Sequence, residues 1–259
     1  MNVIEFYNYT LSSGFVSYLK NLTFSIQEGD SVAILGPAGS GKRRLLSIIA
    51  QAAWNKKRFF FQDSYQQKGE IYLFQIPCLP KPEHHACDVV SSQIGYVSDK
   101  NSWLPISIAQ NFQVTQKILG LSEIIPFYDY IESLPISSRN KAQILSFSEF
   151  LPSQVEDPFL QQLAVMRELL KKPKLFLIGD VFLRMDPVLI KQTERLILSQ
   201  QENTTLVWAI DDLYQASRIT NKIIFIKDGS LIEYANTDLF FTNPSTGEAE
   251  SFISGRDDV

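Results

Sequence analysis

The chain has 259 residues, a net charge of −4 at pH 7 and a pI of about 5.3, and 45% of its residues are hydrophobic. An acidic balance argues against a nucleic-acid-binding surface, so no nucleic-acid partner is expected. No apolar stretch approaches the ~20 residues that cross a bilayer, and the N-terminus lacks the pattern of a signal peptide. Two cysteines indicate a reducing compartment. We therefore expect a cytoplasmic protein, with enough apolar residues for one large domain.

Strands and one helix are predicted in the first hundred residues. Residues 15–26 alternate as a strand does, and a short apolar strand follows over 31–35. Residues 44–50 then have helical spacing. Two further strands are expected over 69–74 and 93–97.

The middle of the chain is predicted to be helical. Residues 106–150 have helical periodicity that is broken by Pro126 and Pro135, so we expect a helical subdomain over about 103–160. The segments predicted after it are an amphipathic helix, two buried strands and a hairpin that turns at Asp-Gly: 160–171, 174–178, 205–210 and 223–232.

A phosphate-binding loop stands between the predicted strand 31–35 and the helix that follows. Its residues read Gly-Pro-Ala-Gly-Ser-Gly-Lys, so backbone N–H groups and a lysine converge on phosphates. The next position normally carries Ser or Thr for Mg²⁺, and here it is an arginine, which cannot ligate a metal although its charge could replace part of the metal's. The alternative is a glycine-rich turn that binds nothing. The candidate nucleotide-binding residues are Gly36, Pro37, Ala38, Gly39, Ser40, Gly41, Lys42 and Arg43.

The combination of this loop with later segments resembles the ATP-binding-cassette ATPases, most of all those of bacterial phosphate importers. Residues 103–111 read Trp-Leu-Pro-Ile-Ser-Ile-Ala-Gln-Asn and, like 236–244 and 252–256 near the C-terminus, resemble segments of that family. Asp186-Pro187 matches as well, and the resemblance covers essentially the whole chain.

The resemblance implies an α/β fold in which residues 1–259 form one nucleotide-binding domain. Such a domain has a P-loop NTPase core, an antiparallel β subdomain and a helical subdomain. The implied ligand is ATP, and the implied partners are membrane permease subunits and a second nucleotide-binding subunit in a homodimer or heterodimer. The implied location is peripheral, on the inner face of the cell membrane.

The catalytic positions of the family are mostly changed. The residue that should stack on adenine is Ser13, and the glutamine that touches the metal is Asp99. The strand that should end in Asp-Glu ends in Gly179-Asp180, and the switch histidine is Asp211. Asp180 and Asp211 are thus candidate catalytic residues only by position, and the alternative is that both are solvated carboxylates at strand ends. Since every expected protein contact to the metal is altered, Mg²⁺ binding is in doubt.

The glycine-rich signature loop of the family is also missing. A gap-free comparison places 155–159 at its position, and two looser candidates are 145–149 and 151–154. None keeps the glycine pair, and Glu156 and Asp157 would repel a phosphate. We therefore expect an ATP-binding subunit of an importer, phosphate-importer-like, with impaired or no ATP hydrolysis. The alternative is a non-catalytic cassette-like module with a binding or regulatory role.

All cysteines and histidines of the chain fall within ten residues. Cys78, His84, His85 and Cys87 are four side chains that can ligate zinc. Their spacing matches no standard zinc finger, and prolines surround them. The alternative is therefore a variable surface loop in which these residues happen to coincide.

Overall fold

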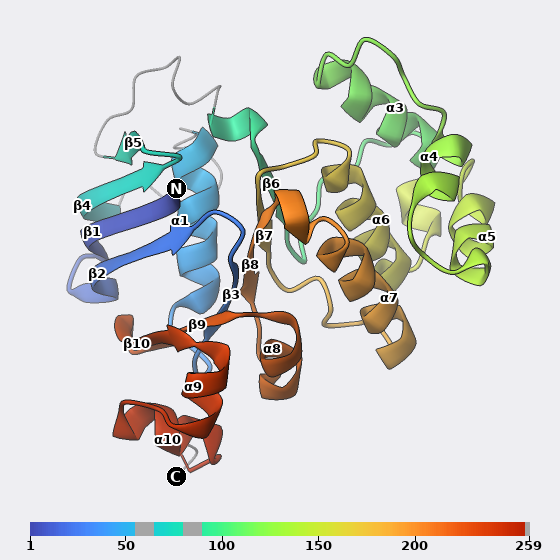
Figure 1. Ribbon diagram of the computed structural model, residues 1–259. Helices are drawn as coiled ribbons and strands as arrows, with labels where there is room; N and C mark the ends of the chain where they lie inside the picture. The colour runs from blue at the N-terminus through green and yellow to red at the C-terminus, as the bar shows by residue number, and fades with distance from the viewer. Residues whose placement is uncertain (55–64, 80–89, 257–259) are drawn as a thin grey trace.

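The computed structural model describes residues 1–54, 65–79 and 90–256, whose strands form two sheets (Figure 1). The first sheet is antiparallel, with the strand order β2-β1-β4-β5. Its strands are β1 (Asn2–Ser13), β2 (Val16–Gln27), β4 (Tyr65–Leu73) and β5 (Ile76–Leu79).

The second sheet has six strands in the order β10-β9-β3-β8-β7-β6. All neighbours are parallel except β10, which returns antiparallel to β9 through a turn at Asp228–Gly229. Both turn residues have positive φ, as a two-residue hairpin requires. The strands are β3 (Ser31–Leu35), β6 (Ile94–Val97), β7 (Leu175–Ile178), β8 (Thr205–Ala209), β9 (Lys222–Lys227) and β10 (Ser230–Asn236).

Helices cover both faces of this parallel sheet. The helix α1 lies between the two sheets, whereas α3, α4 and α5 gather on the side away from the antiparallel sheet (Figure 1). Helices run over α1 (Lys42–Trp54), α3 (Ile108–Ile118), α4 (Phe127–Ser133), α5 (Ser138–Ser146), α6 (Asp157–Leu169), α7 (Pro187–Leu198), α8 (Leu213–Ile219), α9 (Thr237–Thr242) and α10 (Gly247–Ile253), with short 3-10 turns η1 (Pro152–Gln154) and η2 (Gln201–Asn203).

The alternation of side chains along β3 builds two cores. Val32 and Ile34 pack with α1 and the antiparallel sheet, whereas Ala33 and Leu35 pack on the opposite face with the helices. All five residues of β3 are buried, which explains why a parallel central strand reads as a continuous apolar run. The strand therefore ends at Leu35 in a well-packed position, and the loop that follows starts from a rigid base.

The predicted α/β fold class is confirmed, with its antiparallel sheet and its helical part. Pro126 occupies the N-cap of α4, and Pro135 lies between α4 and α5, so the prolines separate the helices as expected. The limits of a helical subdomain over 103–160 stay a prediction. Across the described part of the chain, no helix is long and apolar enough to cross a membrane.

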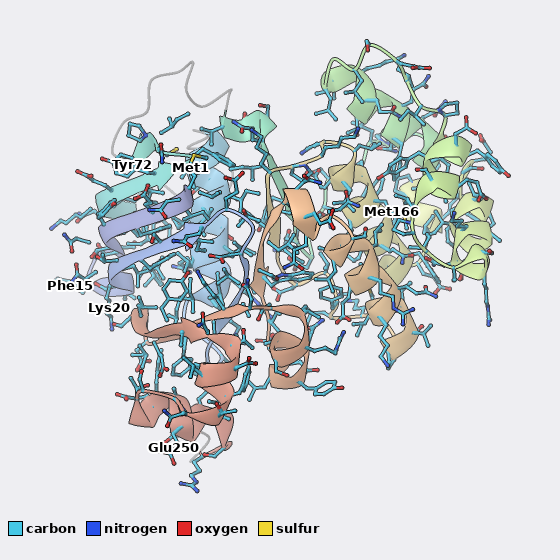
Figure 2. The ribbon with its side chains drawn as sticks, in the orientation of Figure 1. Met1, Phe15, Lys20, Tyr72, Met166 and Glu250 are labelled. Carbon is cyan, nitrogen blue, oxygen red and sulfur yellow. The ribbon has the colours of Figure 1, made fainter. Side chains whose placement is uncertain are left out.

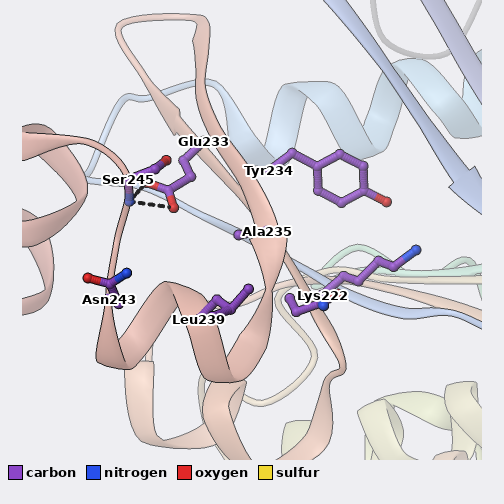
Figure 3. A pocket seen from close by; sticks show the side chains of 8 residues that line it. Lys222, Glu233, Tyr234, Ala235, Leu239, Asn243 and Ser245 are labelled. Carbon is purple, nitrogen blue, oxygen red and sulfur yellow. Dashed lines mark hydrogen bonds between the residues drawn. The ribbon is translucent and has the colours of Figure 1, made fainter.

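A buried carboxylate helps to attach the C-terminal segment to the parallel sheet, beside the packing of Phe240 and Phe252 on Phe225. Glu233 on β10 accepts hydrogen bonds from the backbone N–H groups of Ser245 and Thr246 and from the Thr246 hydroxyl, at 3.0 to 3.2 Å (Figure 3). A buried carboxylate is tolerated because it is fully hydrogen-bonded. This contact fixes the segment that leads into α10 at the edge of the parallel sheet.

Candidate nucleotide-binding site

The loop 36–42 joins β3 to α1, so the predicted strand–loop–helix arrangement is present. A Cβ on Gly36 would lie 2.1 Å from the carbonyl oxygen of Ile226, so no larger residue fits there. The Gly229 N–H, in the β9–β10 turn, donates to the carbonyl of Ser40 at 3.0 Å and holds the loop against that turn. The loop is therefore a tightly packed element, since neighbouring backbone fixes its shape.

A cleft of about 750 Å³ opens above this loop. The loop, the start of β2 and the β9–β10 turn line it, and Lys20, Lys42, Arg43 and Arg44 supply four cationic side chains. The hydroxyl of Ser40 is buried and has no hydrogen-bond partner among the described residues. A buried unpaired hydroxyl in a basic cleft suits an anionic oxygen of a ligand, because buried polar groups are almost always hydrogen-bonded.

Four charged side chains form an ion network in the cleft. The Lys42 ammonium lies 2.8 Å from Asp211 and donates to the carbonyl of Gly36 at 2.8 Å. The guanidinium of Arg43 lies 2.6 Å from Asp180 and 3.4 Å from Asp211. The residues that the sequence analysis singled out on three separate segments thus meet at one place. The network forms because β7, β8 and α1 all end or begin at the same edge of the parallel sheet.

The two carboxylates differ in environment. The Asp180 side chain is 13% exposed, whereas that of Asp211 is 56% exposed. Burial raises the pKa of Asp180 above its usual value, Arg43 lowers it, and the charges of Asp211 and Asp99 raise it. Asp180 is therefore a largely buried carboxylate whose charged form is stabilised by Arg43. Asp211 is a more exposed carboxylate that pairs with Lys42.

The side chains at this place leave few free oxygen atoms for Mg²⁺. The ion prefers oxygen atoms in an octahedron at about 2.0–2.1 Å. The nearest carboxylates, Asp180 and Asp211, are each already paired with a cation. Gly179 offers no side chain, and a Cβ there would lie 3.2 Å from the carbonyl of Val97. In the described residues, no group of three His, Cys, Asp or Glu side chains could hold a metal.

Two residues of the cleft were missed from the sequence. The guanidinium of Arg44 lies 3.7 Å above the ring of Tyr18, in a cation–π contact, and one of its nitrogens is buried without a partner among the described atoms. Two sequence signals could have pointed to them: Tyr18 lies in the alternating segment 15–26, and Arg44 is the second arginine after the loop. Ser13 ends β1, whereas Phe15, in the turn that leads into β2, is fully exposed (Figure 2).

The stretch at the position of the signature loop begins a helix. Glu156 is the N-cap of α6, and Asp157 is its first residue and pairs with Arg184. The looser candidates 145–149 and 151–154 fall at the end of α5 and in the region of η1. Asp186 caps α7, because its carboxylate accepts from the N–H groups of Val188 and Leu189. A structural reason thus accounts for the Asp-Pro pair.

Only one of the four candidate zinc ligands lies in the part of the chain that the structure describes. Cys78 is buried at the end of β5, and its sulfur donates to the carbonyl of Ile76. His84, His85 and Cys87 lie outside the described residues. Zinc binding by these four residues stays a prediction.

Comparison with known proteins then decides the family. The sequence pattern of the family described as ABC transporter matches residues 19–181, which include the loop, the helices α3 to α6 and the strand β7. The chain belongs to this family. Its relatives include a phosphate import ATP-binding protein PstB of Mycoplasma capricolum subsp. capricolum, 26% identical over 98% of this chain and 91% of that protein. A second relative is phosphate import ATP-binding protein PstB 2 of Aliivibrio fischeri, 28% identical over 98% of this chain and 90% of that protein.

Solved structures agree on the fold. A dimeric bacterial ABC transporter cassette superposes with a TM-score of 0.71 at 21% identity, over 90% of this chain and 98% of the other. An ATP-binding subunit of an ABC transporter gives a TM-score of 0.72 at 17% identity, over 97% and 98%. The predicted recognition and fold of an ABC ATP-binding subunit similar to the phosphate importers' ATPases are confirmed.

Proposed function

We propose that this ABC transporter family member is the ATP-binding subunit of an importer, of the phosphate-importer type, and that it binds ATP with little or no hydrolysis. The observation that carries the proposal is the ion network over the loop. Lys42 is present to receive phosphates, but the positions expected to hold the metal and the attacking water are occupied by Arg43, Asp180 and Asp211.

Binding is supported by the shape and charge of the cleft. Its basic side chains, its glycine-rich backbone and the unpaired Ser40 hydroxyl all suit a polyphosphate. The names of the relatives support ATP as the nucleotide and phosphate as the solute of the partner transporter.

Slow hydrolysis is supported by the loss of positioned groups. Phosphoryl transfer depends on positioning and on charge neutralisation, so an error of ~1 Å can cost about 10²-fold in rate. The Asp180 carboxylate is engaged by Arg43 at 2.6 Å, which opposes its use as a base for water. Glu156 at the start of α6 adds negative charge at the position from which the family's signature loop would approach the nucleotide of a second subunit, and Asp157 beside it is paired with Arg184.

The partners follow from the family. We propose that the chain works with membrane permease subunits and with a second nucleotide-binding subunit, as a peripheral protein at the inner face of the membrane. The superposition on a dimeric cassette is consistent with such pairing.

Calorimetric titration with ATP tests the binding part. The native chain is compared with Lys42→Met, which keeps an unbranched apolar stem and removes the charge. A matched control is Lys68→Met on β4, outside the cleft. Binding that Lys42→Met abolishes and Lys68→Met retains supports the proposal, provided that both variants keep the native circular dichroism. An affinity equal in all three chains would refute nucleotide binding by this loop.

The alternative is a non-catalytic module that does not couple to a membrane permease. The ion network supports the non-catalytic part of this alternative, because the pairs of Asp180 and Asp211 with Arg43 and Lys42 are compatible with a permanently inactive site. Co-expression with permease subunits encoded beside the gene separates the two functions. Co-purification supports the importer subunit, and its absence together with intact ATP binding supports the module.

A further inference from the structure

We propose that this site binds nucleotide phosphates without a divalent cation, with Arg43 as the cation at the place where the family uses a metal; the inference rests on the proposed nucleotide binding. The starting point is the mismatch between the donor set and a metal. The carboxylates that could ligate one are already neutralised by Lys42 and Arg43.

Arg43 is held at the phosphate side of the cleft. It lies at the start of α1, directly after Lys42, and its side chain turns toward the ends of β7 and β8. The pair between its Nε atom and Asp180 anchors the guanidinium at 2.6 Å, in the way that a carboxylate would anchor a metal ion. Because Asp180 is largely buried, this anchor is protected from solvent.

The guanidinium keeps donors for a ligand. Arginine carries five N–H donors in a planar fork that matches phosphate oxygens. The pairs with Asp180 and Asp211 use its Nε and Nη2 atoms, and more than half of the side chain, 57%, stays exposed on the cleft. A phosphate that reaches Lys42 would therefore also meet the outer face of Arg43.

Asp211 makes the site self-neutralised before a ligand arrives. Its two oxygens face Lys42 and Arg43 at 2.8 and 3.4 Å, so one carboxylate occupies the anion position between both cations. Asp211 is half exposed and follows β8, and a phosphate can displace it toward solvent. Exchange of one anion for another requires no metal.

The test is calorimetric titration of the full chain with ATP in EDTA and in excess Mg²⁺, with Mg²⁺ titrated alone as a further run. We expect the two dissociation constants to agree within about threefold. Binding only with Mg²⁺ would overturn the inference and leave the proposed ATP binding intact. No binding in either buffer would overturn both.

Substitution of Arg43 identifies the cation. In EDTA, Arg43→Ser should weaken ATP binding by about tenfold to a hundredfold, because a charge-assisted hydrogen bond to phosphate is lost. Arg43→Lys keeps the positive charge and disturbs folding less than Arg43→Ser does. It should retain more of the affinity for ATP. Arg139→Ser, on an exposed part of α5, is the control and should bind like the native chain. Equal metal-free affinity in all of these chains would refute the role of Arg43.

Discussion

Asp211 opposes the nucleotide, and its neutralisation should therefore strengthen binding. A phosphate that contacts Lys42 must come close to a carboxylate that now lies 2.8 Å from the same ammonium. Two like charges about 4 Å apart repel by ~1 kcal/mol in water and by ~4 kcal/mol at an effective dielectric constant of 20. Because 56% of the Asp211 side chain is exposed, the repulsion belongs near the lower end.

We expect Asp211→Asn to bind ATP about tenfold more tightly, since ~1.4 kcal/mol corresponds to a factor of ten. The lost pair with Lys42 changes little, because exposed ion pairs contribute about 0–1 kcal/mol. The assay is calorimetric titration in EDTA, with Asp129→Asn on the remote α4 as the control of equal net charge. Unchanged or weaker binding by Asp211→Asn would refute the view that this carboxylate competes with phosphate.

Three further predictions concern the fold around the site. Gly229→Ala should unfold at a lower temperature than Gly39→Ala. Both glycines have φ near +80°, but only at Gly229 would an added Cβ meet backbone, the Tyr18 carbonyl oxygen at 2.5 Å. Such crowding costs about 1–3 kcal/mol of stability, and equal melting temperatures of the two variants would contradict this. Trp208→Ala should lose about 3–5 kcal/mol of the free energy of unfolding in urea titrations, because this side chain is fully buried in the core, and a loss below ~1 kcal/mol would be inconsistent with that packing. Burial raises the pKa of Asp180, so the folded state holds the carboxyl proton more tightly than the unfolded chain does. The free energy of unfolding of the native chain, relative to that of Asp180→Asn, should therefore fall as pH rises through the carboxyl range. The opposite slope would refute a raised pKa for Asp180.

Much of the parallel sheet could be predicted because its strands are short, apolar and separated by clear turns. The strand 31–35 was predicted at the bounds that the structure has, and the Asp-Gly hairpin is β9 and β10. The first strand, Asn2–Ser13, was not predicted. Its register shifts against β2 and β4 and the positive φ of Asn8 break the alternation on which a strand prediction depends.

The site was predictable only in part. The loop was evident because its glycines and lysine are contiguous, and Asp180 and Asp211 were singled out by position. That both carboxylates pair with Arg43 could not be read from the sequence, because the contacts join residues 137 and 168 positions apart. The cation–π contact of Arg44 with Tyr18 in the cleft could not be predicted either, because it depends on how β2 packs beside α1.

The central claim is that ATP binds while its hydrolysis is lost, and single-turnover hydrolysis tests it most directly. The chain, at a concentration well above its dissociation constant for ATP, is mixed with Mg²⁺ and a smaller amount of labelled ATP. The Lys42→Met variant and a protein-free sample are run in parallel. We predict that ATP is bound but converted at close to the protein-free rate. Conversion at ~1 s⁻¹ or faster, lost in Lys42→Met, would contradict the account and restore a working ATPase.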